Sequence, residues 1–129
     1  MNCTSYVCAA ISLGELIEKI SILQIKTKQF KGVALANVNK ELKNLESILN
    51  NLQLNIEPSF IQRLKEVNAE HWQIEDETRD KERKKEFGES FIRLARSVYQ
   101  QNDRRAAIKK EINTTYRSVL VEEKSYQQY

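Results

Sequence analysis

The sequence predicts an all-α protein, a helical bundle, and three observations lead to this prediction. The chain has 129 residues with only three Gly and one Pro, so it is poor in the residues that break helices and form turns. Charged residues make up 30% of it and hydrophobic residues 40%. Apolar residues also recur at alternating spacings of four and three, which is the period of one helix face. The segment Tyr6 to Ile11 has some strand character, but a lone strand has no partner, so no sheet is expected.

The first predicted element is an antiparallel helical hairpin over residues 13–31 and 35–53. Ser12 and Glu15 have the spacing of a capping box, in which both side chains bond free backbone N–H groups at a helix start. Gly32 supplies the stop between the two helices, because glycine tolerates the left-handed conformation. So short a connection makes the helices fold back on each other. The two apolar stripes are Leu16, Ile20, Leu23, Thr27, Phe30 and Val38, Leu42, Leu45, Leu49, Leu52.

A long third helix and two shorter ones are predicted to complete the bundle. The third helix begins at Pro58, whose missing N–H costs nothing in a first turn, and continues to about Lys85. Its stripe comprises Phe60, Leu64, Val67, His71, Ile74 and Thr78. After the break at 87–89, the fourth helix is built on Phe91, Leu94, Ala95 and Val98. Asn102 and Asp103 are then expected to form a turn before a fifth helix, Arg104 to about Asn113, built on Ala107, Ile108 and Ile112.

Length indicates one domain over residues 1–129, with an extended N-terminal segment at 1–11 and a tail at 114–129 that docks on the bundle. The net charge of +3 is too balanced to require a nucleic-acid or membrane partner. No stretch is apolar and long enough for a signal peptide or a membrane span. Cys3 and Cys8 lack the further ligands of a zinc site, and reduced thiols are favoured over a disulfide. We therefore expect a cytoplasmic protein without a cofactor.

The stretch HWQIEDETRDKERKKE, His71 to Glu86, holds the only His and the only Trp of the chain. Carboxylates at one-turn spacing, including Glu75 and Asp76, could hold Mg²⁺ or Mn²⁺, with His71 as a proton carrier. Such metal-dependent hydrolases need a matching acidic motif on another helix, and none is visible. One His and two N-terminal Cys also allow no catalytic triad, so no catalytic residue is assigned. The favoured interpretation is a structural helix, in which Glu75–Arg79 is a surface ion pair.

This interpretation makes positional predictions. His71 lies on the apolar stripe, so it should face the hairpin and be largely buried, neutral and hydrogen-bonded. Trp72 should sit at the edge between core and solvent, near the fourth helix or the tail. Residues 80–85 should be fully exposed.

A second candidate site is the basic segment from Arg93 to Arg117, which holds seven basic residues and two acidic ones. With a turn at Asn102–Asp103, its two short helices could form a helix-turn-helix that places Arg104 and Arg105 in a nucleic-acid groove. A basic helix face is more often simply solvated. Nucleic-acid or phosphate binding is therefore an alternative and not the favoured function.

The chain resembles an uncharacterised family of small helical proteins of unknown function, known mainly as predicted products of aquatic bacteria and their phages. The segments that carry the resemblance are Ser12–Lys26, Asn37–Leu42, Trp72–Glu82, Phe91–Asn113 and Glu122–Tyr126. They cover nearly the whole chain. The resemblance implies no activity, because the family has none assigned.

The polar positions of these segments suggest a cleft for a small anionic or sugar-like ligand. In it, arginines would supply charge, and Trp72, Tyr99 and Tyr126 would supply stacking surfaces. The opposing interpretation is that the same positions form interhelical ion pairs that pin the tail. The ligand-binding candidates are Trp72, Glu75, Asp76, Arg79, Tyr99, Asn102, Arg104, Lys124 and Tyr126.

The function that this pattern favours is a non-catalytic helical interaction or structural module. Three helices with wide apolar faces should leave some self-complementary apolar surface that the bundle does not bury. Because twofold dimers are the commonest oligomers, a homodimer is expected. A protein partner or a small anionic ligand is the other expected partner.

Overall fold

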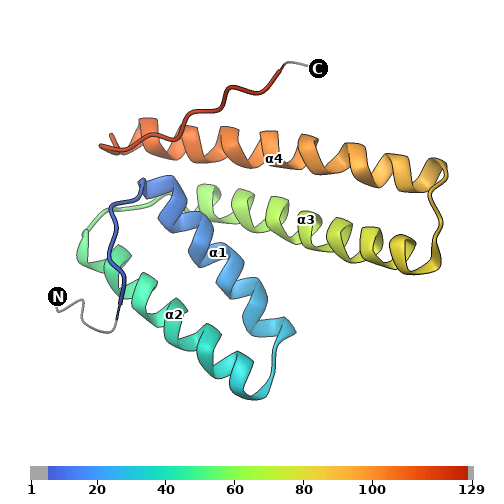
Figure 1. The fold of residues 1–129 in the computed structure, drawn as a ribbon. Helices are drawn as coiled ribbons and strands as arrows, with labels where there is room; N and C mark the ends of the chain where they lie inside the picture. The colour runs from blue at the N-terminus through green and yellow to red at the C-terminus, as the bar shows by residue number, and fades with distance from the viewer. Residues whose placement is uncertain (1–5, 128–129) are drawn as a thin grey trace.

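The computed structural model describes residues 6–127, and this part of the chain contains four helices and no strand. The helices are α1 (Leu13–Gln29), α2 (Gly32–Asn51), α3 (Pro58–Lys84) and α4 (Glu89–Thr115). The prediction of an all-α bundle is confirmed. Two hairpins, α1–α2 and α3–α4, form the fold (Figure 1). Helix α1 packs against α2 on one side and against α3 and α4 on the other, whereas α2 contacts no helix except α1.

The first hairpin begins as predicted and turns slightly earlier. Ser12 caps α1 by accepting a hydrogen bond from the Glu15 backbone N–H at 3.1 Å. Helix α1 ends at Gln29, two residues before the predicted end. Gly32 begins α2 with a φ of +63°, a backbone conformation that glycine adopts without strain. Helix α2 then ends at Asn51.

The second hairpin corrects the predicted helix count, because α4 is one continuous helix of 27 residues. Pro58 begins α3 as expected, and Gly88 caps the start of α4. The turn predicted at Asn102–Asp103 does not exist. Both side chains are exposed, and Asn102 accepts a hydrogen bond from Arg105 one turn later. A mid-helix Asn or Asp that faces solvent does not compete with the helical backbone bonds, and packing on α1 and α3 then decides for helix.

The hydrophobic core lies where α1 packs against both α3 and α4. Its buried members are Leu13, Leu16, Ile17, Ile20, Phe60, Leu64, Val67, Ile108 and Ile112. The stripe of α2 packs on this core from outside and is mostly only half-buried. On α3, the predicted stripe is buried only as far as Val67, since His71, Ile74 and Thr78 are half-buried. Ala107, predicted as a core residue, is exposed.

Helices α3 and α4 continue well past the end of α1, and no other helix covers them there (Figure 1). No residue between 69 and 107 is buried. Asp80 and Lys81 are half-buried, contrary to the predicted full exposure of 80–85, and residues 82–85 are exposed.

The C-terminal tail meets the start of α1 and then runs alongside α4 (Figure 1). The tail is held by the Ser118 hydroxyl, which accepts a hydrogen bond from the Leu13 backbone N–H at 3.1 Å and donates one to the Leu120 carbonyl at 2.7 Å. Cys8 is disulfide-bonded, so the expectation of reduced thiols is wrong for this residue. Cys3 lies outside the described residues.

Candidate functional site

Seven of the nine predicted ligand-binding residues line two neighbouring pockets of about 330 Å³ each. The Trp72 pocket is lined by Ile22, Ile25, Asn68, His71, Trp72, Glu75, Asp76, Arg79 and Arg105. The tail pocket is lined by Glu15, Glu18, Asn102, Asp103, Arg105, Ala106, Lys109, Glu122, Lys124 and Tyr126. Arg105 lines both pockets.

Trp72 is held at the edge of the core by the end of α1. Its ring meets the Phe30 ring edge-to-face, with centroids 6.4 Å apart and planes 72° apart. The side chain is half-buried, as predicted for a boundary residue. The predicted neighbours were the fourth helix or the tail, whereas the observed aromatic neighbour is the residue that follows α1. One part of the indole therefore stays available to the pocket in a fixed orientation.

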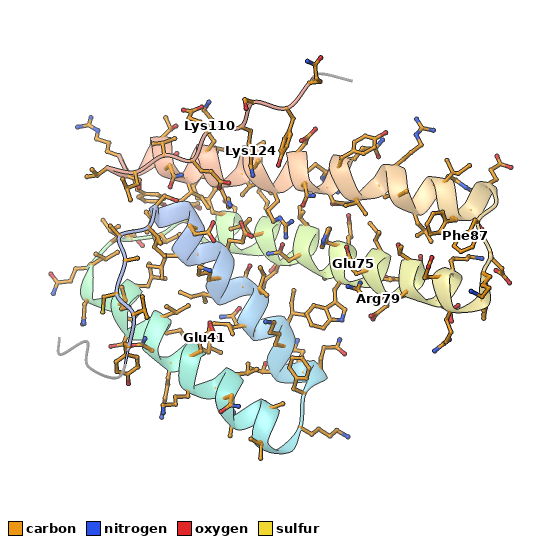
Figure 2. All side chains as sticks on the ribbon, viewed as in Figure 1. Glu41, Glu75, Arg79, Phe87, Lys110 and Lys124 are labelled. Carbon is orange, nitrogen blue, oxygen red and sulfur yellow. The ribbon has the colours of Figure 1, made fainter. Side chains whose placement is uncertain are left out.

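Glu75 lies between two positively charged or titratable side chains of α3. It forms an ion pair with Arg79, and Figure 2 shows these two side chains next to each other. Its other oxygen is 3.6 Å from the His71 Nε2 atom. Burial, reinforced by the charge of Arg105, lowers the pKa of His71 below 6.5, so the ring is neutral at pH 7.

His71 faces α1 as predicted, because it shares the pocket wall with Ile22 and Ile25. Its side chain is 20% exposed, so it is less buried than predicted. The Nδ1 atom is buried and has no hydrogen-bond partner among the described residues. The prediction of a fully hydrogen-bonded histidine is therefore wrong at this nitrogen.

The Arg105 guanidinium is fixed by side chains from three helices. It donates to Asn68 on α3 at 3.1 Å and to Asn102 on α4, and it lies 3.8 Å from the Glu18 carboxylate on α1. Asn68 in turn donates to the fully buried Ser21 hydroxyl at 2.8 Å. A planar donor group held at several points presents its remaining N–H groups in one geometry.

The tail pocket is organised around Lys109, a buried lysine with three carboxylate partners. Its Nζ atom lies 2.8 Å from Glu15, 2.9 Å from Glu18 and 2.7 Å from Glu122. Burial alone would lower the pKa of Lys109, but the hydrogen bonds to Glu122, Glu15 and Glu18 outweigh it and raise that pKa. The same contact with Lys109, assisted by Lys124, lowers the pKa of Glu122 to about 2. Lys109, Glu15 and Glu122 are thus charged at pH 7.

These contacts pin the tail to the bundle, as the opposing interpretation of the polar positions predicted. Lys109 of α4 binds Glu122 of the tail together with Glu15 and Glu18 of α1. Lys124 also forms an ion pair with Glu122, at 2.9 Å. Figure 2 shows Lys124 on the tail, which runs alongside α4 near Lys110. Lys110 reaches Glu123 at only 3.9 Å, and both side chains are largely exposed.

The structure therefore sorts the nine predicted site residues into three groups. Four belong to the Trp72 pocket: Trp72, Glu75, Asp76 and Arg79. Three belong to the tail pocket: Asn102, Lys124 and Tyr126. Arg104 and Tyr99 line neither pocket. Arg104 instead bonds Glu70 at 2.9 Å on the outer side of α3 and α4.

The cleft arginine on α4 is Arg105, which sequence reasoning had placed only in the basic segment. Glu18, Asn68 and Lys109 were also missed as site residues. A signal exists in the sequence for two of these residues: Arg105 and Lys109 are one helical turn apart, so they share a face of α4. Glu18 lies off the apolar stripe of α1, so its burial could not be read from that stripe.

The basic segment does not form a helix-turn-helix, because the turn that the motif requires is helical in α4. Four of its seven basic residues also lie near carboxylates: Arg104 near Glu70, Arg105 and Lys109 near Glu18, and Lys110 at 3.9 Å from Glu123. Among residues 6–127, no three His, Cys, Asp or Glu side chains gather in an arrangement that could hold a metal ion.

The fold and the two pockets define a small all-α protein with a polar cleft between α1, α3 and α4. By sequence the chain belongs to a family that is described as a family of unknown function, DUF6165, and the match spans residues 7–129. Neither the curated proteins nor the solved structures contain a match to this chain.

Proposed function

We propose that this protein is a non-catalytic helical module that binds a small, uncharged, hydroxyl-rich ligand in the Trp72 pocket. The observation that carries the proposal is the set of fixed groups around one pocket. Trp72 is held by Phe30, and the Arg105 guanidinium is held by Asn68 and Asn102. A pocket of about 330 Å³ matches the lower end of the range for small-molecule sites.

The charge balance of the pocket favours a sugar-like ligand over an anion. Glu75 and Asp76 supply two carboxylates, Arg79 and Arg105 supply two guanidinium groups, and His71 is neutral at pH 7. A sugar ring can stack its C–H face on the indole, accept hydrogen bonds from Arg105 and donate hydroxyls to Glu75. An anionic ligand that binds an arginine of this pocket would also come close to Glu75 or Asp76, and the repulsion from that carboxylate would offset the attraction.

The proposal is tested through Trp72, because the only tryptophan of the chain lines the pocket. Tryptophan fluorescence is measured while D-glucose, D-galactose or N-acetyl-D-glucosamine is added, with sodium sulfate as the anionic probe. We expect a saturable change with at least one sugar and none with sulfate. If no sugar gives saturation, the proposal is wrong.

Two conservative variants separate the pocket from the rest of α4. Arg105→Lys keeps the charge and loses the planar donor group, so it should remove the sugar response. Arg104→Lys changes the adjacent residue, which lines neither pocket, and should leave the response unchanged. Equal responses from the two variants would contradict a role for the pocket.

Three further expectations remain proposals. Nucleic-acid binding through residues 93–117 has weaker support, because Arg104, Arg105 and Lys109 are already paired with carboxylates. No helix among the described residues is long and apolar enough to cross a membrane. The cytoplasmic location and the homodimer remain predictions from the sequence. For the nucleic-acid alternative, the supporting result would be retardation of an oligonucleotide that weakens as salt is added.

A further inference from the structure

The end of the α3–α4 hairpin is a helical structure without a core. We define the distal hairpin as residues 76–98, which comprises the last turns of α3, the connecting turn and the first turns of α4. None of these residues is buried, and Figure 1 shows this end extending beyond α1. Helices draw most of their stability from packing an apolar face, so two helices that pack only on each other are marginal in water.

Apolar side chains are nevertheless present along the distal hairpin. Phe87 is 52% exposed and Ile92 55% exposed, and Figure 2 shows Phe87 at the tip. The Phe87 and Phe91 rings meet edge-to-face at 5.3 Å, which is the one aromatic pair recorded in this part of the described chain. Leu94 is only half-buried.

A groove of about 520 Å³ runs between the two helices of the distal hairpin. Its α3 wall carries Asp76, Glu77, Asp80 and Lys81, and its α4 wall carries Arg93 beside Leu94. Lys81 is neutralised by Glu86 at 3.0 Å. Asp80 is neutralised by Lys84 and Arg83. Among the described residues, no ion pair is recorded for Asp76, Glu77 or Arg93. One wall is thus acidic, the other is basic, and an apolar side chain lies in the groove.

These opposite walls make the surface complementary to itself. A twofold axis parallel to the hairpin places α3 of one copy over α4 of the other. The acidic wall of each copy then faces the basic wall of its partner, so the acidic–basic contact forms twice. The two Leu94 side chains are covered in the same step.

We propose that the distal hairpin is the dimerisation surface of this protein and that its occupant is the distal hairpin of a second copy, with Glu77 of each copy opposite Arg93 of the other. The resulting four helices supply the shared core that each hairpin lacks. The proposal rests on Glu77, Arg93 and Leu94, none of which lines the Trp72 pocket, whereas Asp76 lines both the groove and that pocket.

The first experiment measures the mass of the full chain by sedimentation velocity at high micromolar concentration. The expected mass is twice the 15.1 kDa of one chain. Leu94→Asp should give the mass of a single chain, while the neighbouring Ala95→Asp should not, because Ala95 is exposed and does not line the groove. Wild-type protein with the mass of one chain would overturn the proposal, whether or not another protein binds this surface.

The second experiment tests the charge pairing by exchange. Arg93→Glu places acid opposite acid, and Glu77→Arg places base opposite base, so each variant alone should dimerise at least about tenfold more weakly. In an equimolar mixture, both pairs of the heterodimer are again opposite in charge, so the mass should return to twice that of one chain. A mixture that stays monomeric, or single variants that dimerise like wild type, would refute the proposed pairing. Because the mixture contains only the two variants, its recovery also shows that both are folded.

Discussion

Removal of the Lys109 ammonium should be the most destabilising single change in the polar cleft. Lys109→Met keeps the unbranched apolar stem of the side chain, one atom shorter, and deletes its charge. The lysine and Glu18 are both about 10% exposed, and their charged atoms are 2.9 Å apart. Breaking a buried ion pair from one side typically costs about 3–5 kcal/mol, because the remaining charge stays buried.

The structure places the expected cost at the lower end of that range. Glu18 keeps Arg105 at 3.8 Å after the substitution, so its charge is not left entirely alone. Glu15 and Glu122 are 31% and 38% exposed and can be solvated. We therefore expect a loss of about 3 kcal/mol in the free energy of unfolding, which corresponds to about 10 °C in Tm for a domain of this size.

Urea denaturation followed by far-UV circular dichroism at pH 7 measures this loss, with Lys110→Met as the matched control. Lys110 is 62% exposed and 3.9 Å from Glu123, so its substitution should change stability little. Adding Glu18→Gln to Lys109→Met should recover part of the loss, because it removes the unpaired buried charge. A loss below about 1 kcal/mol, or no recovery in the double variant, would refute the reasoning.

Three further predictions concern the cleft and the tail. Gly14→Ala should destabilise by about 1–3 kcal/mol despite the better helix propensity of alanine, because its Cβ would lie 2.7 Å from the Lys109 carbonyl oxygen. Gly88→Ser, where a Cβ meets nothing within 4 Å, should not destabilise, and thermal unfolding compares the two. The docked tail should detach in acid, because the pKa of Glu122 is lowered from 4.5 to about 2. The stabilisation from the Glu122–Lys109 ion pair is therefore complete above pH 4.5 and is lost as the pH falls toward 2. NMR of the tail amides can follow this loss. His71 should titrate below 6.5 in an NMR pH series of the folded protein. Because the unfolded chain then binds more protons than the folded one, the free energy of unfolding should fall as the pH drops below 6.5. A titration midpoint at or above 6.5 would contradict the observed burial of the ring.

The helices were predictable because their signals are local. The spacing of apolar residues, Ser12 as a cap and Pro58 as a first helical residue act within one or two turns, and all three signals have the expected outcome in the structure. The prediction of a turn at Asn102–Asp103 was wrong because it relied on a local signal alone. Its local preference is weak, and contacts of α4 with α1 and α3 outweigh it.

The candidate site was predictable only in part. Trp72, Glu75, Asp76 and Arg79 share one helix face, so their convergence in one pocket follows from helix periodicity alone. The choice between Arg104 and Arg105 could not be made in that way, because adjacent residues point about 100° apart and the contact with α1 decides which one faces the cleft. Likewise, Trp72 meets Phe30 because α1 ends beside it.

By itself the sequence determined that this chain is helical, where its first hairpin folds back and which α3 residues share a polar face, since periodicity and capping are properties of neighbouring residues. Only the tertiary structure decided that α1 packs against both α3 and α4, that Glu15, Glu18 and Glu122 surround Lys109, and that the distal hairpin has no buried core. These features join residues that are far apart in the chain. They depend on how the helices pack, which local preferences do not specify.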